Sequence, residues 1–314
     1  MSVVWDVSPE IFSIGSFEVR WYGLSWAIAF ALGMVFFANF IQREKLPPKT
    51  LDSIIWYGAL STIIGARLGH CLFYDPGYYL QNPLEMLKIW EGGLASHGAA
   101  VGLLVGLWLF SRKRKLPYVW GLDRIMVPVT VGGAFVRLGN LMNSEIYGRP
   151  TDLPWGFEFI RDRHWLENSP QGLPVHPTQI YEALCYIVTF LVIIWLYYSR
   201  DEGRKRPGVM FGVGLIGVFL ARFFIEYLKN PQVEFENNMA LMMGQWLSIP
   251  FVLLGIFMIV WAYRKKPVEV DAVMLQQKKK AEAAANIKSK SAQEAKSPAA
   301  KPSGPSSRSG KGKK

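Results

Sequence analysis

Apolar residues in this chain come in seven long blocks, separated by stretches in which Pro, Gly and charged residues gather. The blocks cover residues 19–40, 51–73, 94–110, 120–141, 178–198, 208–228 and 241–263. Each is close to the length of about 20 residues that a helix needs to cross the hydrocarbon core of a bilayer. The pattern predicts an all-α polytopic membrane protein with seven transmembrane helices. Pro128 predicts a kink in the fourth of them.

The stretches between the blocks differ in length and character. Residues 142–177 form the longest loop, rich in Pro, Trp and charge, and residues 74–93 form a second loop whose one basic residue is Lys88. From residue 267 onward Lys, Ala, Ser, Pro and Gly dominate, a composition that cannot bury a core. We therefore expect a seven-span catalytic domain at 1–266, with an external polar loop region, and a disordered basic tail at 267–314.

Basic clusters follow the first, third, fifth and seventh blocks, for example at 112–115 and 264–266. Cytoplasmic loops carry an excess of Lys and Arg, so these ends are predicted to be cytoplasmic. The N-terminus is then outside and the C-terminus in the cytoplasm. No Lys or Arg precedes Arg20, so the first block lacks the basic start of a secretory signal peptide and is expected to be retained.

Net charge and cysteine content argue against nucleic-acid binding and against disulfide or metal sites. The formal net charge is +11, which could suggest nucleic-acid binding, but the excess lies in the tail and beside the blocks. That placement fits anionic membrane lipid as the partner of the tail better than nucleic acid. Cys71 and Cys185 both lie inside apolar blocks, so neither a disulfide framework nor a metal site follows. We expect no metal and no cofactor.

Polar residues inside the apolar blocks carry the candidate chemistry. Residues 132–148, at and just beyond the end of the fourth block, hold Arg137, Asn140, Asn143 and Glu145 among several glycines. A charged side chain in a membrane span is costly, so an intramembrane arginine is a functional-site hypothesis. A single arginine could instead snorkel to the interface. The accompanying amides and glutamate favour a polar site at the membrane surface.

On the predicted topology, further polar residues gather at the same external ends. Tyr22 begins the first block, where an interfacial aromatic belt is an equally good explanation. Arg67 fits a structural ion pair at least as well as a ligand contact. His97 opens the third block among glycines, and both a general base and a structural hydrogen-bonding residue remain open. His176 precedes the fifth block, where an ordinary helix start is the favoured interpretation.

Arg222 and Glu226 lie four residues apart on the sixth block and so share a helical face. An internal ion pair would explain them. Arg137 and Arg222, however, lie at similar depth on two blocks, and two guanidinium groups around one cavity suit a phosphate group. The chemistry indicated is the handling of an anionic lipid headgroup at the outer leaflet.

These residues resemble the phosphatidylglycerol:prolipoprotein diacylglyceryl transferases of the bacterial inner membrane. The resemblance spans residues 15–264, and its most specific part is 133–148, which matches the family signature almost throughout. Supporting matches lie at 20–23, 65–69, 92–98, 176–182 and 222–226. Two positions depart from the family pattern: Ala99 stands where a glycine is common, and Lys229 stands where many relatives have arginine.

The resemblance implies transfer of a diacylglyceryl group from phosphatidylglycerol to the lipobox cysteine of a preprolipoprotein signal peptide, with release of glycerol 1-phosphate. It implies catalytic roles for Tyr22, His97, Arg137 and Arg222. It also implies phosphatidylglycerol contacts by Arg137, Arg222, Asn140, Glu145, Gly148 and Glu226. The implied location is the bacterial inner membrane, with a periplasmic N-terminus.

A transporter or flippase for an anionic lipid or solute is the alternative function. It would explain the intramembrane arginines equally well. Such folds show internal repeats with discontinuous helices at matching positions, and the sequence offers no convincing repeat. A seven-span receptor fits the topology but does not explain the polar cluster.

Overall fold

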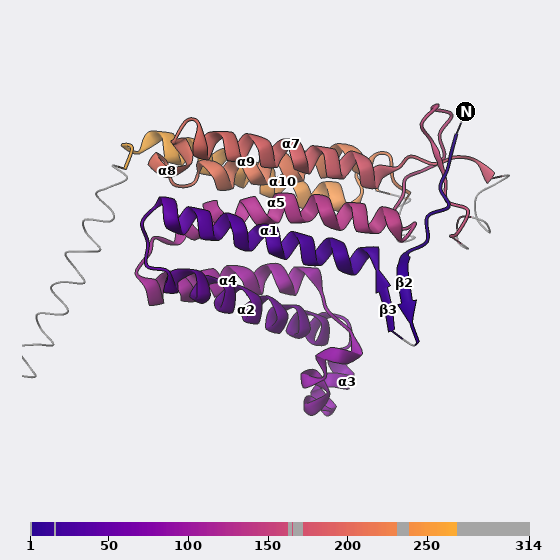
Figure 1. Ribbon diagram of the computed structural model, residues 1–314, viewed down its shortest axis with the longest axis horizontal. Helices are drawn as coiled ribbons and strands as arrows, with labels where there is room; N and C mark the ends of the chain where they lie inside the picture. The colour runs from indigo at the N-terminus through magenta and orange to yellow at the C-terminus, as the bar shows by residue number, and fades with distance from the viewer. Residues whose placement is uncertain (1, 16, 163–164, 166–171, 231–238, 269–314) are drawn as a thin grey trace, which may run out of the picture. The chain divides into compact units, whose positions relative to one another are not determined.

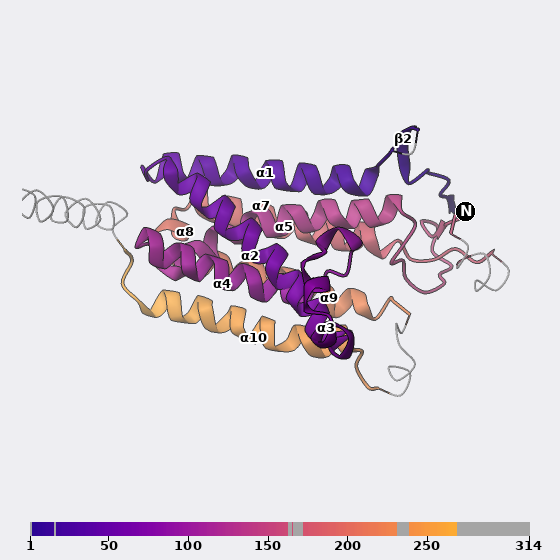
Figure 2. The same cartoon turned by 90° about the horizontal axis from the view of Figure 1, so that it is seen from below.

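The computed structural model describes residues 2–15, 17–162, 165, 172–230 and 239–268. The structure is mostly helical, as predicted, and its long helices lie side by side in both views (Figures 1 and 2). They are α1 (Trp21–Arg43), α2 (Lys49–Phe73), α4 (Ser96–Arg114), α5 (Tyr118–Met142), α7 (Thr178–Tyr198), α9 (Val209–Glu226) and α10 (Met243–Arg264).

Five of the helices in the described residues are long and apolar enough to cross a membrane: α1, α5, α7, α9 and α10. The chain is therefore a multi-pass membrane protein. Helices α2 and α4 occupy the positions of the second and third predicted spans but are not among the five. Glycines and the basic residues Arg67 and Arg112–Arg114 dilute their apolar content.

Helices α2 and α4 pack closely through small residues. A Cβ atom added at Gly69 would lie 2.7 Å from the Cα of Gly98, so the two backbones approach where glycines face each other. Helices α1 and α5 form a second close pair, in which a Cβ added at Gly33 would lie 3.0 Å from the Cβ of Pro128. Helix α5 continues through Pro128. Helices α9 and α10 also pack closely, where Gly212 and Gly255 face each other, so α2–α4, α1–α5 and α9–α10 are tight pairs among the described helices.

Four short strands depart from the all-α prediction. Strand β1 (Val3–Val4) pairs in parallel with β4 (Phe157–Glu158), and β2 (Glu10–Ile14) pairs antiparallel with β3 (Phe17–Arg20). Gly15, with a φ of 63°, follows β2 and supplies the left-handed conformation that the turn requires. Runs of two to five residues are too short for periodicity to identify, which is why the sequence did not reveal them.

Short helical segments complete the described chain. The 3-10 helices η1 (Pro83–Leu87) and η2 (Ile89–Glu91) follow α3 (Pro76–Gln81) in the loop between α2 and α4, and α8 (Glu202–Lys205) lies between α7 and α9. We call the end of the bundle with the strands and the described residues 143–162 and 172–177 the loop end. The opposite end, where α1, α4 and α10 finish in basic residues, is the basic end (Figure 1).

Candidate active site

A cavity of about 690 Å³ lies between the α1–α5 pair and the α2–α4 pair. Most of its wall is apolar, with Phe30 and Ile54 among its lining residues. At the loop end it reaches Tyr22, Arg137 and Asn140. The cavity is therefore amphipathic along its length, apolar over most of its wall and cationic at one end.

Arg137 is held in place by a buried carboxylate. Its Nε pairs with Oε2 of Glu182 on α7, and its Nη1 donates to Oδ1 of Asn140 at 3.3 Å. The side chain of Glu182 is 1% exposed, whereas that of Arg137 is 17% exposed. The guanidinium group is thus anchored from the protein interior while part of it remains accessible at the cavity.

The ionic contacts continue beyond Glu182. Its Oε1 accepts from Nζ of Lys229 at 2.7 Å, and the same Nζ lies 3.6 Å from Oε2 of Glu226. Positive and negative groups alternate from α5 through α7 to the end of α9. The sequence pattern alone does not mark Glu182 or Lys229 for this role. A carboxylate within the apolar block at 178–198 was the available signal.

The loop after α5 is tied to the same site. Asn140 Nδ2 donates to Oε1 of Glu145 at 2.7 Å, and Gln179 Nε2 donates to the Glu145 carbonyl at 2.7 Å. Thr178 Oγ1 donates to the carbonyl of Ile146 at 2.9 Å. The first turn of α7 therefore fixes the backbone that carries Glu145.

Backbone strain flanks Glu145. Ser144 and Ile146 have φ values of 55° and 61°, in the left-handed region that non-glycine residues rarely adopt. A β-branched residue there is a genuine outlier, and such strain concentrates at functional sites. Ile146 also lines the cavity.

Gly148 is explained by close packing. A Cβ atom added there would lie 2.8 Å from both the Cβ of His176 and the Cγ2 of Thr178. Its backbone N–H donates to the carbonyl of His176 at 2.8 Å. Gly148 is not among the cavity-lining residues, so its contact with substrate remains a prediction.

Arg222 and Glu226 lie near the end of α9 but not at the wall of the cavity. Glu226 is 4% exposed and contacts Lys229. Among the described residues, no ion pair joins Glu226 to Arg222, so the alternative of an internal pair between these two is not supported, and Glu226 contacts Lys229 instead. The structure brings Tyr22, Arg137 and Asn140 to one cavity and leaves Arg222 outside its lining.

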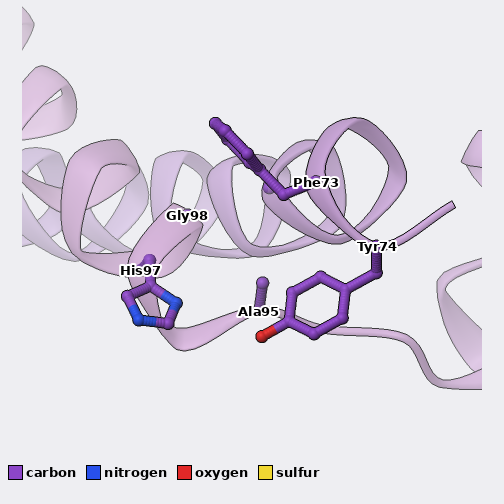
Figure 3. Close-up of a pocket in the computed structure, with 6 residues that line it drawn as sticks. Phe73, Tyr74, Ala95, His97 and Gly98 are labelled. Atoms are coloured by element: carbon purple, nitrogen blue, oxygen red, sulfur yellow. The ribbon is translucent and has the colours of Figure 1, made fainter. Parts of the chain in front are cut away.

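His97 lines a second pocket of about 420 Å³ beside the ends of α2 and α4. Figure 3 shows the rings of His97 and Tyr74 on either side of Ala95. His97 is exposed in the first turn of α4. The structure thus separates it from the pocket that holds Arg137.

Arg67 binds backbone carbonyls. Its guanidinium donates to the carbonyl oxygens of Met86 at 3.0 Å, Gly92 at 2.7 Å and Glu85 at 2.6 Å, and it lies over the Tyr79 ring. Within the described residues it has no carboxylate partner, so the ion-pair interpretation does not hold. Arg67 instead folds the 74–93 loop onto α2.

His176 lies just before α7, as the helix-start interpretation predicts. Its Nδ1 lies 3.3 Å from the hydroxyl oxygen of Tyr181. Partial burial, and then the nearby charge of Arg149, lower the pKa of the His176 imidazole below its ordinary value. No group of three His, Cys, Asp or Glu side chains in the described part of the chain could hold a metal ion.

Apolar helices around an amphipathic cavity, with a fixed guanidinium at one end, define a membrane-embedded protein that can accommodate a lipid. The profile of the prolipoprotein diacylglyceryl transferase family matches residues 9–261. The chain belongs to this family.

Three similar proteins carry the name phosphatidylglycerol–prolipoprotein diacylglyceryl transferase. That of Porphyromonas gingivalis is 47% identical over 279 residues, covering 85% of this chain and 96% of the relative. That of Chloroherpeton thalassium is 41% identical over 268 residues, covering 85% and 97%. That of Bacteroides fragilis is 42% identical over 281 residues, covering 86% and 98%.

Proposed function

We propose that this protein transfers the sn-1,2-diacylglyceryl group of phosphatidylglycerol to the cysteine thiol of a prolipoprotein, the first step of lipoprotein maturation. A carbon–sulfur bond forms at the glyceryl carbon, its bond to the phosphate oxygen breaks, and glycerol 1-phosphate leaves. The thiol proton passes to a base. The amphipathic cavity that ends at Arg137 carries this proposal. Membership of a transferase family favours the enzyme over a transporter or flippase.

Arg137 and Asn140 are the groups that we assign to the phosphate. A planar guanidinium presents several N–H donors in a fixed fork that matches phosphate oxygens. Because Glu182 already holds Arg137, its charge needs no reorganisation as the phosphate departs. Tyr22 lies at the same end of the cavity, and the acyl chains run along the apolar wall.

Glu145, Gly148, Arg222 and Glu226 complete the proposed site. Glu145 orients Asn140 directly through a hydrogen bond. Glu226 acts on Arg137 through Lys229 and Glu182. Gly148 keeps the loop close to α7. Arg222 supplies a second cation near the end of α9, where the anionic leaving group can be attracted as it departs.

We assign to His97 the role of the base that accepts the thiol proton. Because its pocket is separate from the cavity, the peptide thiol must approach from the side of α2 and α4. His97→Gln should then bind phosphatidylglycerol normally but transfer slowly, with a defect that shrinks as pH rises toward the thiol value of about 8.5. A loss that is independent of pH, together with weakened lipid binding, would make His97 a headgroup contact instead.

We further propose seven spans, with the loop end periplasmic and the basic end in the cytoplasm of a bacterium. Reporter fusions at Arg43, Lys113, Lys205 and Lys266 should all report the cytoplasm, and one external result would overturn the topology. Residues 1–266 form the catalytic unit in this proposal, and residues 267–314 bind anionic lipid. Truncation after Lys266 should leave transfer in membranes intact.

The direct test uses purified protein, phosphatidylglycerol and a peptide with a lipobox cysteine. Mass spectrometry should find the peptide heavier by one diacylglyceryl group. The matched controls are the same peptide with serine in place of cysteine, and phosphatidylethanolamine in place of phosphatidylglycerol. Product without phosphatidylglycerol, or none with the complete mixture, would refute the proposal.

A further inference from the structure

The cavity follows the helices for much of their length. Its lining on α1 extends from Tyr22 to Phe37, and its lining on α5 from Asn140 to Ile125. Each pair is 15 residues apart (37 − 22 and 140 − 125), which at about 1.5 Å per residue gives roughly 22 Å. One leaflet of hydrocarbon is about 15 Å thick, half of the bilayer core. The cavity is therefore deep enough to hold an extended acyl chain.

The deep end of the cavity is closed by buried side chains. Phe37, Ile54 and Leu107 line it there and are only 6%, 3% and 1% exposed. Phe40 and Phe110, one turn nearer the basic end, belong to the same hydrophobic cluster and are fully buried. Neither of them lines the cavity. Since protein interiors are close-packed, a chain that reaches this level cannot advance further.

The flank of the cavity is different. Phe30, Met34 and Ile63 line it as well, yet they are 63%, 47% and 43% exposed. In a membrane these faces meet lipid tails, so an acyl chain that enters the cavity exchanges one apolar surrounding for another. Moving an acyl chain from the membrane into the cavity therefore discriminates little between chains of different length. Selectivity must come from how completely a chain fills the space above the closed end.

We infer that Phe37, Ile54 and Leu107 form a floor that selects the length of the acyl chain carried by the lipid substrate. The inference rests on the proposed function and adds a specificity that the function does not itself require. A chain that is too short leaves an unfilled space above the floor and loses packing contacts. A chain that is too long must bend before its headgroup can reach Arg137.

Gly58 offers a way to move this floor. It lines the cavity four residues after Ile54, which places it about 6 Å nearer the loop end. A Cβ atom added at Gly58 would lie 3.9 Å from Leu103 Cδ1, an ordinary contact. A larger side chain there projects into open space. Gly58→Leu should therefore raise the floor, and Phe37→Ala should lower it.

The test is a competition within one reaction. Detergent-solubilised full-length protein receives a lipobox peptide and an equimolar mixture of dilauroyl, dimyristoyl, dipalmitoyl and distearoyl phosphatidylglycerol. Mass spectrometry then gives the acyl composition of the lipidated peptide. Because the readout is a ratio of products, a general loss of activity does not affect it. Leu60→Phe is the matched control, since Leu60 lies on the same helix, is half exposed and does not line the cavity.

Gly58→Leu should shift the product ratio toward shorter chains by about tenfold, and Phe37→Ala should shift it toward longer chains. Leu60→Phe should keep the wild-type ratio. If either variant does not fold, Gly58→Ala and Phe37→Leu should show smaller shifts in the same directions. Unchanged ratios in all folded variants would overturn the inference. Absence of lipidated peptide with the wild-type protein would instead refute the proposed function.

Discussion

Two clusters of buried charge lie in the bundle, one toward each end. The cluster toward the basic end centres on Glu44, whose Oε1 accepts from Arg124 Nη2 at 2.7 Å and from the Tyr197 hydroxyl at 2.8 Å. Its Oε2 accepts from Trp120 Nε1 at 2.6 Å. Arg124, with a side chain that is 2% exposed, also lies over the rings of Trp120 and Tyr197.

Asp123 belongs to the same cluster and is equally well satisfied. It is fully buried and accepts from the backbone N–H groups of Gly208 at 2.7 Å and Phe211 at 2.8 Å. It thereby caps the start of α9, where helical N–H groups lack partners within the helix. The basic-end cluster thus ties α1, α5, α7 and α9 together through contacts that use both carboxylates fully.

The loop-end cluster has the same residue types but is not closed in this way. Arg137 is partly exposed and lines a cavity. Among the described side-chain atoms, buried groups without a hydrogen-bond partner occur toward both ends, at Glu226 Oε2 and Gln179 Oε1 near the loop end and at Glu202 Oε2 and Arg204 Nε near the basic end. The comparison teaches that access to a cavity, more than the presence of buried charge, separates a structural cluster from a candidate site.

The largest effect should come from breaking the basic-end cluster. Arg124→Met leaves the buried Glu44 carboxylate without its charge partner and should lower the free energy of unfolding by about 3–5 kcal/mol. Thermal unfolding of the purified protein measures the loss. Arg112→Met, at an exposed arginine of α4, is the control and should cost less than about 1 kcal/mol. The affinity of the remaining folded protein for phosphatidylglycerol should stay unchanged. A lower affinity would show that the basic-end cluster also contributes to lipid binding.

Arg137→Lys should affect activity rather than stability: the rate of transfer should fall about a hundredfold, with little change in thermal stability. An ammonium group can still pair with Glu182, so the buried charge stays compensated, but it cannot reproduce the planar fork toward phosphate. Steady-state transfer to a lipobox peptide gives the rate. Arg161→Lys, at an exposed arginine near the loop end, is the control. Normal turnover of Arg137→Lys would show that Arg137 acts only through its charge and not through the geometry of its guanidinium group.

The sequence predicted those features of the two clusters that depend on one continuous segment of the chain. Long apolar blocks predicted the helices, and polar residues at 137–145, at and just beyond the end of such a block, predicted Arg137, Asn140 and Glu145 as site residues. Contacts between helices could not be read in the same way. The pairing of Glu182 with Arg137 and Lys229 arises only when α5, α7 and the end of α9 pack together.

Loops were predicted least well, because their backbone supplies much of the bonding. Arg67 suggested an ion pair, but its partners are carbonyl oxygens, which every residue carries and no sequence pattern marks. His97 was placed with the other polar residues by its depth in the predicted membrane. Its position on the α2–α4 pair instead puts it in a separate pocket.

A smaller effect at the loop end should come from Gly148→Ala. The added methyl group would meet the backbone carbonyl oxygen of Leu228 most closely, and the His176 Cβ and Thr178 Cγ2 at 2.8 Å, so the loop must shift, at a cost of about 1–3 kcal/mol. Because the same loop carries Glu145, transfer should fall together with stability. Gly77→Ala is the control, since nothing lies within 4 Å of a Cβ built there. Lost stability with normal transfer would show that the loop does not position the site.

The smallest effect is a pH dependence at the loop end, where His176 lies. Burial and Arg149 lower the pKa of His176 in the folded protein, so near the ordinary value of about 6.5 the unfolded chain binds more protons. Stability should therefore decrease as pH falls through this value.

His176→Asn should weaken that decrease, because the group that binds the extra proton in the unfolded chain is gone. Arg149→Met should weaken it as well, since it removes one of the two causes that lower the pKa of His176. Arg161→Met, which removes an exposed cation elsewhere near the loop end, should keep the wild-type slope. Thermal unfolding midpoints at several pH values between about 8 and 5 compare the four proteins. If the unfolding midpoint depends on pH equally in all four proteins, His176 contributes nothing to the pH dependence of stability.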